Sequence, residues 1–448
     1  MSTKAAKATR TTTWALAAAL AAAAWPAASA AGAEPPATDE AYACRQDIHP
    51  QDPEFPGVHV AALEEAPNGD LLYVFYAGQR EKADDVATYL SRLEAGAEDW
   101  VEPHIVFDEP DRPDGNAVLW VDDANDRVHL LFSTIMESEW TEAILRQMTS
   151  EDDGHTWSEP QVVREEYGWL YGTLPFRMSN GEVIVPIYSE TEWSAGWYVS
   201  DDDLATVTVH PSEDDTTWPT SLGGMIQPAT VELEDGHLLA LNRSRDFMIW
   251  RTESLDYGRT WSTATPTDMP NNNSRVALLK LDSGNLILAQ NPTRSGRTPL
   301  RLSLSEDGGQ TWSAGVDVEA EDSEEFSYPY LLQTSDGLIH LGYTHRRESM
   351  RHVAFTEEFV RSGANIPSDN AFDVKYEFRD GEVSQVATCA FVHNAALAAP
   401  APAPEGLNEP APAPDATGGS SLPATGGGLA LVGLTLAGVA LAARRHGR

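Results

Sequence analysis

Short runs of apolar and β-branched residues recur along the central part of the chain, most of them after a polar turn sequence. The runs cover residues 71–76, 128–133, 183–188, 238–241, 286–290 and 338–343. The turns are rich in Asn, Asp and Gly, as in Asn68-Gly69-Asp70. Apolar runs of this length that follow such turns predict β-hairpins rather than helices. The pattern therefore predicts an all-β domain.

A repeated octapeptide lies near these runs. Its pattern is Ser-x-Asp-x-Gly-x-Thr-Trp, and its copies begin at Ser150, Ser254 and Ser305. The copies are about 50 or about 100 residues apart, which predicts another copy near residue 200 and indicates an array of similar units. Ser200 begins a segment that keeps Ser, Asp and Thr but has lost Gly and Trp, and a more divergent copy ends at Trp100.

The octapeptide has the composition of a turn that locks a hairpin. Ser and Asp side chains hydrogen-bond to turn amides, Gly adopts positive φ, and Trp packs against the strands. We therefore expect structural residues away from the functional site, with too few carboxylates for a calcium loop. About 350 residues at this period make about six four-stranded blades. The predicted fold class is all-β, a six-bladed β-propeller over residues 46–391.

Composition and charge narrow the class of protein. The 448 residues include 30 Lys and Arg against 69 Asp and Glu, which gives a formal net charge of −39. This charge argues against nucleic acid as a partner and against electrostatic binding to anionic lipid, because both need clustered cations. The sequence has no HExxH, P-loop, dinucleotide-binding or Cys/His zinc motif, so neither a metal nor a cofactor is expected.

The first 30 residues are typical of a secretory signal peptide. Basic residues precede an apolar run over residues 14–25, and small residues end the segment at Ala30. A transmembrane anchor is the alternative, but the run is too short to cross a bilayer. Residues 31–45 are interpreted as a lead-in to the domain. The mature chain is therefore expected outside the cytoplasm.

The C-terminal residues 422–448 are similar to the sorting signal of surface proteins of Gram-positive bacteria. An LPxTG sequence is followed by an apolar stretch and a basic tail, and its defining residues are Leu422, Pro423, Thr425 and Gly426. The resemblance implies that a sortase joins the threonine to peptidoglycan. A permanent single-span anchor is the alternative. The Ala/Pro-rich residues 392–421 are expected to form an extended stalk that lifts the domain off the cell wall.

Cys44 and Cys389 are the two cysteines of the chain. They lie just before the first and just after the last of the predicted blades, and the two ends of a propeller meet in space. In a secreted protein this placement predicts a disulfide that closes the ring, with two unpaired thiols as the alternative.

The octapeptide resembles the Asp-box of exo-sialidases (neuraminidases), which are six-bladed propellers, and the resemblance covers about residues 46–391. It implies a glycosidase site with an arginine triad for a sugar carboxylate, an Asp acid/base, and a Tyr nucleophile that a Glu activates. Non-catalytic propellers carry the same box, so activity has to be argued from the site.

Three segments match the sialidase pattern. Arg80 and Asp85 match an arginine and the acid/base five residues later, with Asp84 as a substitute and a surface ion pair as the alternative role. Arg297 matches another triad arginine. Tyr328 matches the nucleophile, with a buried structural tyrosine as the alternative. By this resemblance Asp85 protonates the leaving oxygen while Tyr328 attacks the anomeric carbon.

Other positions depart from that pattern. His59 replaces the first triad arginine, and Gln227 replaces the Glu that activates the tyrosine. Because a neutral Gln cannot act as a base, Glu325 is the carboxylate expected to assist Tyr328. The segment before Ser254, where a third arginine belongs, is apolar. The role of this third arginine would then be taken by a nearby arginine whose side chain extends into the site. The candidates are Arg243, Arg245 and Arg251.

These observations lead us to expect a monomeric cell-surface exo-glycosidase of sialidase type that removes terminal acidic sugars from glycans. Arg80, Arg297 and His59 would supply positive charge for the sugar carboxylate. A non-catalytic glycan-binding adhesin is one alternative. The other is a propeller hydrolase or lyase for glycans that contain uronic acid, in which His59, His345 and Tyr328 would transfer protons.

Overall fold

The computed structural model describes residues 39–49, 56–212, 222–368, 374–379, 381–390 and 393–394. The predicted signal peptide, most of the predicted stalk and the LPxTG segment lie outside these residues. None of the helices in the described part of the chain has the length and apolar character that a membrane span requires.

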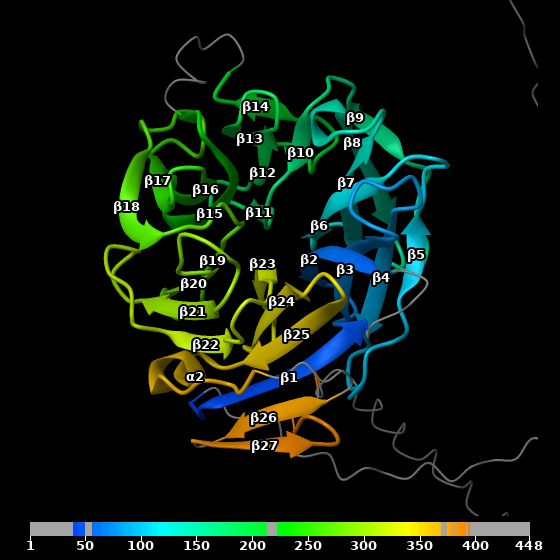
Figure 1. Ribbon diagram of the computed structural model, residues 1–448. Coiled ribbons are helices and arrows are strands. Elements are labelled where there is room, and N and C mark those ends of the chain that lie inside the picture. The colour runs from blue at the N-terminus through cyan, green and yellow to red at the C-terminus, as the bar shows by residue number, and fades with distance from the viewer. Residues whose placement is uncertain are drawn as a thin grey trace, which may run out of the picture. The chain divides into compact units, whose positions relative to one another are not determined.

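Six antiparallel sheets are arranged around a common axis, and together they form the six-bladed β-propeller that the sequence predicts (Figure 1). The strands of the first three blades follow in chain order. The first blade contains β2 (Gly57–Glu65), β3 (Leu71–Gly78), β4 (Ala87–Leu93) and β5 (His104–Phe107). The second contains β6 (Asp114–Asp122), β7 (Arg127–Ile135), β8 (Ala143–Ser150) and β9 (Gln161–Arg164), with the 3₁₀ turn η1 (Trp140–Glu142) before β8. The third contains β10 (Trp169–Tyr171), β11 (Phe176–Arg177), β12 (Val183–Ser189), β13 (Ser194–Ser200) and β14 (Thr208–His210).

The other three blades continue around the ring. The fourth contains β15 (Met225–Glu234), β16 (His237–Ser244), β17 (Met248–Ser254) and β18 (Thr265–Pro270). The fifth contains β19 (Ala277–Lys280), β20 (Leu286–Gln290), β21 (Leu300–Ser305) and β22 (Val316–Glu319). The sixth contains β23 (Phe326–Gln333), β24 (Ile339–His345), β25 (Ser349–Phe355), β1 (Tyr42–His49), β26 (Lys375–Arg379) and β27 (Glu382–Val386), with α2 (Glu357–Ser362) after β25.

Each apolar run recognised in the sequence lies in the second strand of a blade. These strands are buried on both faces because blades pack face to face around the ring, which explains why the runs are nearly continuous rather than alternating. The core consists mainly of their Leu, Val, Ile and aromatic side chains.

The N-terminal strand β1 closes the ring. It pairs with β25 on one side and with β26 on the other, so a strand from the start of the chain completes the last blade (Figure 1). This strand begins at Tyr42, within the segment interpreted from the sequence as a lead-in. Cys44 on β1 forms a disulfide with Cys389, as predicted, and their Cα atoms are 5.9 Å apart.

The octapeptides form the turn between the third and fourth strands of their blades. In the copy that begins at Ser150, the Ser150 Oγ accepts from Gly154 N at 2.8 Å, and the Thr156 hydroxyl donates to Asp152 Oδ2 at 2.6 Å. The degenerate copy at Ser200 keeps the same bonds, although Leu204 replaces the glycine at a φ of 66°. The prediction of a further copy near residue 200 is therefore confirmed.

The octapeptide glycines also join neighbouring blades. A Cβ placed on Gly258 would lie 2.9 Å from Ile184 of β12, and one on Gly309 would lie 3.0 Å from Leu239 of β16. Each box therefore packs its turn against the second strand of the preceding blade, in agreement with the structural role predicted for it.

We expect loss of the disulfide to lower the free energy of unfolding without changing the fold. A cross-link between residues 345 positions apart restricts the unfolded chain strongly, so Cys44→Ser with Cys389→Ser should cost about 3 kcal/mol. Urea denaturation of parent and double variant under oxidising conditions measures the difference. If both proteins unfold at the same denaturant concentration, the disulfide does not stabilise the ring.

Candidate active site

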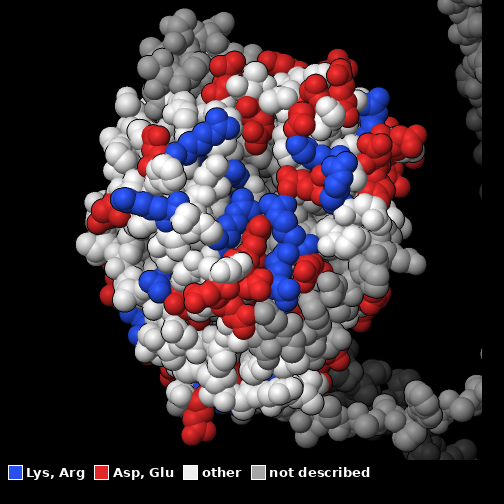
Figure 2. Space-filling model, in the orientation of Figure 1, with Lys and Arg blue, Asp and Glu red and all other residues white. Residues whose placement is uncertain are grey.

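A cavity of about 260 Å³ opens at one end of the propeller axis. Its walls come from the connections between the second and third strands of the blades, which all emerge on the same face because consecutive strands are antiparallel. The octapeptides lie in the connections at the opposite ends of these strands. Basic side chains gather at the centre of this face of a strongly acidic protein (Figure 2).

Four innermost strands have a β-bulge at the level of this cavity. The residues that adopt positive φ there are Val60 on β2, Asn116 on β6, Gln227 on β15 and Tyr328 on β23, with φ of 65°, 50°, 54° and 55°. Non-glycine residues with positive φ are uncommon, and bulges re-aim side chains next to active sites. Because the same bulge occurs in four blades at the level of the cavity, we infer that the bulges orient side chains toward it.

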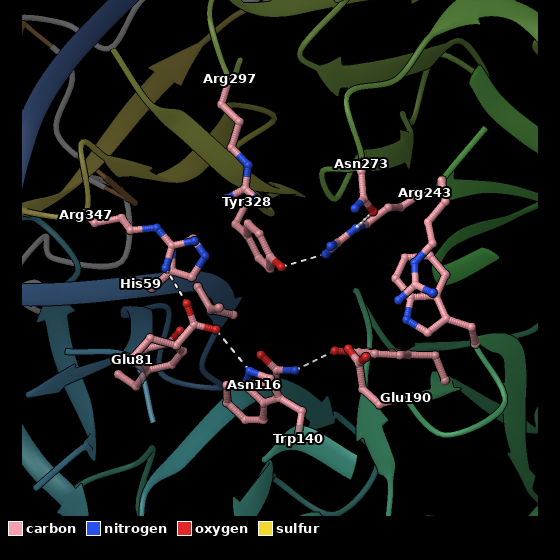
Figure 3. Close-up of a pocket in the computed structure, with 15 residues that line it drawn as sticks. His59, Glu81, Asn116, Trp140, Glu190, Arg243, Asn273, Arg297, Tyr328 and Arg347 are labelled. Atoms are coloured by element: carbon pink, nitrogen blue, oxygen red, sulfur yellow. Dashed lines mark hydrogen bonds and ion pairs between the residues drawn. The ribbon is translucent and has the colours of Figure 1, made fainter. Parts of the chain in front are cut away.

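Tyr328 lies among three arginines (Figure 3). The Arg243 guanidinium donates to the Tyr328 hydroxyl at 2.7 Å, and the Arg297 guanidinium lies 5.3 Å from the centre of the tyrosine ring. Burial would raise the pKa of the Tyr328 hydroxyl, but Arg243, Arg297 and a hydrogen bond with Gln227 outweigh burial and lower that pKa. The cations therefore favour the phenolate, which is the nucleophilic form.

Glu325 and Glu81 hold the arginines in place. Glu325 Oε1 accepts from Arg297 at 2.7 Å and from Arg347 Nε at 2.9 Å, and Arg347 also pairs with Glu81. Burial raises the pKa of Glu325, but the charges of both arginines lower it further than burial raises it. The second Glu81 oxygen accepts from Trp140 Nε1 at 3.0 Å. The two arginines thus stabilise the ionised form of Glu325.

His59 lies beside Tyr328, with ring centroids 4.2 Å apart, and its Nδ1 is 2.8 Å from the Thr344 hydroxyl. Burial, together with the charges of Arg347 and Arg297, lowers the pKa of His59 well below its usual value. The histidine is therefore neutral and does not replace the charge of the missing arginine. Arg347, from the connection between β24 and β25, brings a guanidinium to this side of the cavity.

Glu190 lines the wall opposite Glu81 (Figure 3). Burial raises the pKa of Glu190, although Arg243 and Arg245 act in the opposite direction. The Arg245 guanidinium lies 3.5 Å from the centre of the Trp193 ring, and this cation–π pair lines the cavity. Burial therefore favours the protonated form of Glu190.

Arg275 supports the floor of the site from below. It is buried, and its guanidinium donates to the main-chain oxygens of Gly172, Ala61 and Tyr328 at 3.2, 2.7 and 3.1 Å. These bonds connect the innermost strands of the first and sixth blades with the segment that follows β10. Arg275 therefore fixes the backbone on which Tyr328 is mounted.

Several residues singled out in the sequence meet in this cavity. His59, Arg245, Arg297 and Tyr328 line it. Gln227 contacts it through Arg243, to which its Oε1 is bonded at 3.1 Å, and it donates to Tyr188 at 3.3 Å.

Other predicted site residues lie elsewhere. Glu325 is bonded to Arg297, Arg347 and Ser327, and its described hydrogen bonds do not include Tyr328. Arg80 and Asp85 are exposed outside the lining, and Asp85 accepts from Gln79 N at 3.2 Å. His345 is buried behind the wall, beside Phe326 and Ser349.

The structure adds residues that the sequence reasoning missed. These residues are Glu81, Asn116, Trp140, Glu190, Trp193, Asn273 and Arg347. Most of them follow the second strand of a blade, in the connection that reaches the cavity. Charged and aromatic residues at this place in every repeat are the signal that would have found them.

Comparison with known proteins supports this architecture. The model of the BNR repeat-like domain matches residues 69–341, which is more than half of the chain. No curated protein matches the sequence significantly.

Solved sialidase structures match the fold at low sequence identity. The Hadza microbial sialidase Hz136 superposes with a TM-score of 0.61 at 17% identity, over 70% of this chain and 68% of that one. The intramolecular trans-sialidase from Ruminococcus gnavus has a TM-score of 0.58 at 16% identity, over 70% and 98%. The sialidase of Trypanosoma rangeli has a TM-score of 0.55 at 14% identity, over 70% and 58%. The chain therefore belongs to the family of BNR repeat-like domains and has the six-bladed fold of the sialidases.

Proposed function

We propose that the protein is an exo-glycosidase of sialidase type that releases terminal acidic sugars from glycans. The observation that carries this proposal is the convergence of Arg243, Arg297 and Arg347 on one cavity with the partly buried Tyr328, whose pKa is lowered. Arginines form bidentate, charge-assisted hydrogen bonds with a carboxylate, and Tyr is an established nucleophile for sugars that carry a carboxylate at the anomeric carbon.

The chemistry follows from the charges in the cavity. The Tyr328 oxygen attacks the anomeric carbon, the bond to the leaving oxygen breaks, and Glu190 donates a proton to that oxygen. Water then hydrolyses the tyrosyl-sugar bond, and Glu190 accepts the proton of that water. Because Gln227 cannot take the phenol proton, that proton passes to solvent before the substrate binds, and Arg243 and Arg297 stabilise the phenolate that then attacks.

The proposed general acid is Glu190, whereas the sequence pattern predicted Asp85. Asp85 is exposed outside the cavity, and both oxygens of Glu81 are engaged by Arg347 and Trp140. Burial raises the pKa of Glu190, which is the direction that favours a general acid. Its protonated fraction falls as the pH rises through this pKa, so turnover should fall on the alkaline side.

A release assay on the full mature chain tests the function. A panel of sialyl and uronyl glycosides is incubated with the protein, and the released sugar is identified by mass spectrometry. Release of a terminal sialic acid supports the proposal. Release of uronic acid alone would contradict sialidase specificity and indicate a hydrolase or lyase for uronic-acid glycans. Binding without release would indicate a non-catalytic adhesin, the alternative supported by Gln227, which cannot act as a base.

Glu190→Gln should slow hydrolysis of substrates with poor leaving groups by about 10²–10⁴-fold and remove the alkaline limb of the pH profile. Activated aryl glycosides need no protonation and should lose much less. Asp85→Asn is the matched control and should retain turnover on both kinds of substrate. If Asp85→Asn is the impaired variant, Asp85 is the acid and the loop that carries it moves on binding.

We also propose that the protein acts outside the cell, attached to the wall. The predicted signal peptide and the LPxTG sequence support this location. Fractionation of cells that express Thr425→Ala tests it, because a variant that remains bound to peptidoglycan contradicts sorting at this threonine.

A further inference from the structure

Two arginines and an aromatic residue are exposed beside the cavity, on neighbouring connections of the fourth and fifth blades. Arg245 and Phe247 lie in the turn between β16 and β17, and Arg294 lies between β20 and β21, shortly before Arg297. Arg245 and Arg297 line the cavity. Arg245, Phe247 and Arg294, which we call the rim, therefore continue from the cavity toward solvent.

Neither arginine of the rim has a carboxylate partner within the described residues. The Arg294 guanidinium contacts Met248 Sδ at 3.6 Å, and Arg245 makes its cation–π contact with Trp193. Asp246, which follows Arg245, is exposed and forms no ion pair with either arginine in this part of the chain. The protein has 69 Asp and Glu against 30 Lys and Arg, so guanidinium groups left without a carboxylate are available to an anionic ligand.

The turn that carries Phe247 is fixed in an uncommon conformation. Phe247 is 57% exposed and has a φ of 64°, which a bulky residue keeps only where its surroundings impose it. Its main-chain oxygen accepts from Asn271 N at 3.0 Å, and the Ser244 hydroxyl donates to Met248 O at 2.6 Å across the turn. An aromatic face with a few polar groups beside it is typical of a ligand-binding surface.

The position of Glu190 relates the rim to the leaving group. In the proposed function Glu190 donates a proton to the leaving oxygen, so the leaving sugar extends out of the cavity from this residue. Arg245 and Glu190 both line the cavity, and Arg245 is near enough to act on the pKa of Glu190. The sugar next to the released one therefore lies over the rim.

We propose that the rim binds a second acidic sugar, so that the preferred substrate is a glycan whose terminal acidic sugar is attached to another acidic sugar. This inference rests on the proposed function and names the leaving group of the same reaction. The carboxylate of the second sugar binds Arg245 and Arg294, and its ring packs on Phe247. A neutral leaving sugar makes only the aromatic contact and leaves both cations without a partner.

Two substrates that differ in the leaving sugar test this inference on the full mature chain. In disialyl lactose the terminal sialic acid is attached to a second sialic acid, whereas in sialyl lactose it is attached to galactose. We expect kcat/KM from initial rates to be about tenfold or more higher with disialyl lactose, and this preference should shrink as added salt screens the charges. Arg294→Ala should lower kcat/KM on disialyl lactose by about tenfold or more and on sialyl lactose by less than about twofold.

Arg80→Ala is the matched control, because Arg80 is also exposed and lies between β3 and β4, in a connection on the same face but in the first blade. It should keep the preference for disialyl lactose. Arg294→Lys keeps the charge and should retain more of the preference than Arg294→Ala. Equal kcat/KM on the two substrates in the parent, or an equal loss on both in Arg294→Ala, would overturn the binding of an acidic leaving sugar and leave the proposed function standing.

Calorimetric titration with the same two sugars separates this inference from the proposed function. A parent that releases no sialic acid but binds disialyl lactose about tenfold more tightly than sialyl lactose supports the rim and contradicts the glycosidase. A parent that neither binds nor releases either sugar overturns both.

Discussion

Tyr328→Phe should lower turnover at least about 10³-fold on every substrate that the parent hydrolyses, because it removes the attacking oxygen itself. A loss of this size is about 4 kcal/mol in the activation free energy. Activated aryl glycosides should be affected as strongly as natural glycans, in contrast to Glu190→Gln. The measurement is kcat on both kinds of substrate, with correct folding checked by thermal unfolding.

Tyr330→Phe is the matched control for this prediction. Tyr330 lies two residues further along β23 and is fully buried, whereas Tyr328 is partly buried; Tyr330 does not line the cavity. Its removal should change stability slightly and turnover hardly at all. Full activity in Tyr328→Phe would mean that the tyrosine is structural, which was the alternative role considered for it from the sequence.

The arginines should respond differently from the tyrosine. Arg297→Ala removes a cation proposed to bind the substrate carboxylate, while Glu325 keeps its bonds to Arg347 and Ser327. We expect KM to rise, with a cost of about 1.5–3 kcal/mol for one charged hydrogen bond. A substrate analogue without the carboxylate should show no such rise in KM. Comparison of the substrate with this analogue therefore separates loss of carboxylate recognition from a general effect on folding.

The fold was predictable because its signals are local and repeated. Each octapeptide fixes its own turn through bonds within eight residues, and each apolar run identifies a second strand. The closing strand β1 was not recognised, because its partners β25 and β26 lie more than 300 residues away in the sequence. Cys44 and Cys389 were paired correctly because the closed ring brings both ends of the propeller together.

The site was only partly predictable, because its residues come from connections whose paths depend on the packing of six blades. Tyr328 and Arg297 stand in segments that resemble sialidases, and the structure places both in the cavity. Asp85 satisfied the spacing, yet the neighbouring Glu81 is the residue that faces inward. Arg347 has no counterpart in the expected pattern, since it approaches from the sixth blade toward the side where His59 replaces an arginine.

Glu319→Ala should destabilise the protein by about 3–5 kcal/mol, because removal of one member of a buried ion cluster leaves charges without compensation. The Glu319 side chain is fully buried at the end of β22. It pairs with Arg45 of β1 at 3.2 Å and with Arg351 of β25 at 2.7 Å. One carboxylate thus connects the fifth blade with the strand that closes the ring.

This arrangement makes the effect of Glu319→Ala larger than that of an ordinary ion pair. The Tyr343 hydroxyl donates to Glu319 at 2.6 Å, so a buried phenol also loses its acceptor. Glu358→Ala is the control, because Glu358 is an exposed partner of Arg361 at 3.8 Å and should change stability by less than about 0.5 kcal/mol. Urea denaturation of both variants measures the difference. If Glu319→Ala unfolds at the parent's denaturant concentration, water or a rearranged Asp47 compensates the two arginines, and closure of the ring depends on the disulfide and the strand pairing instead.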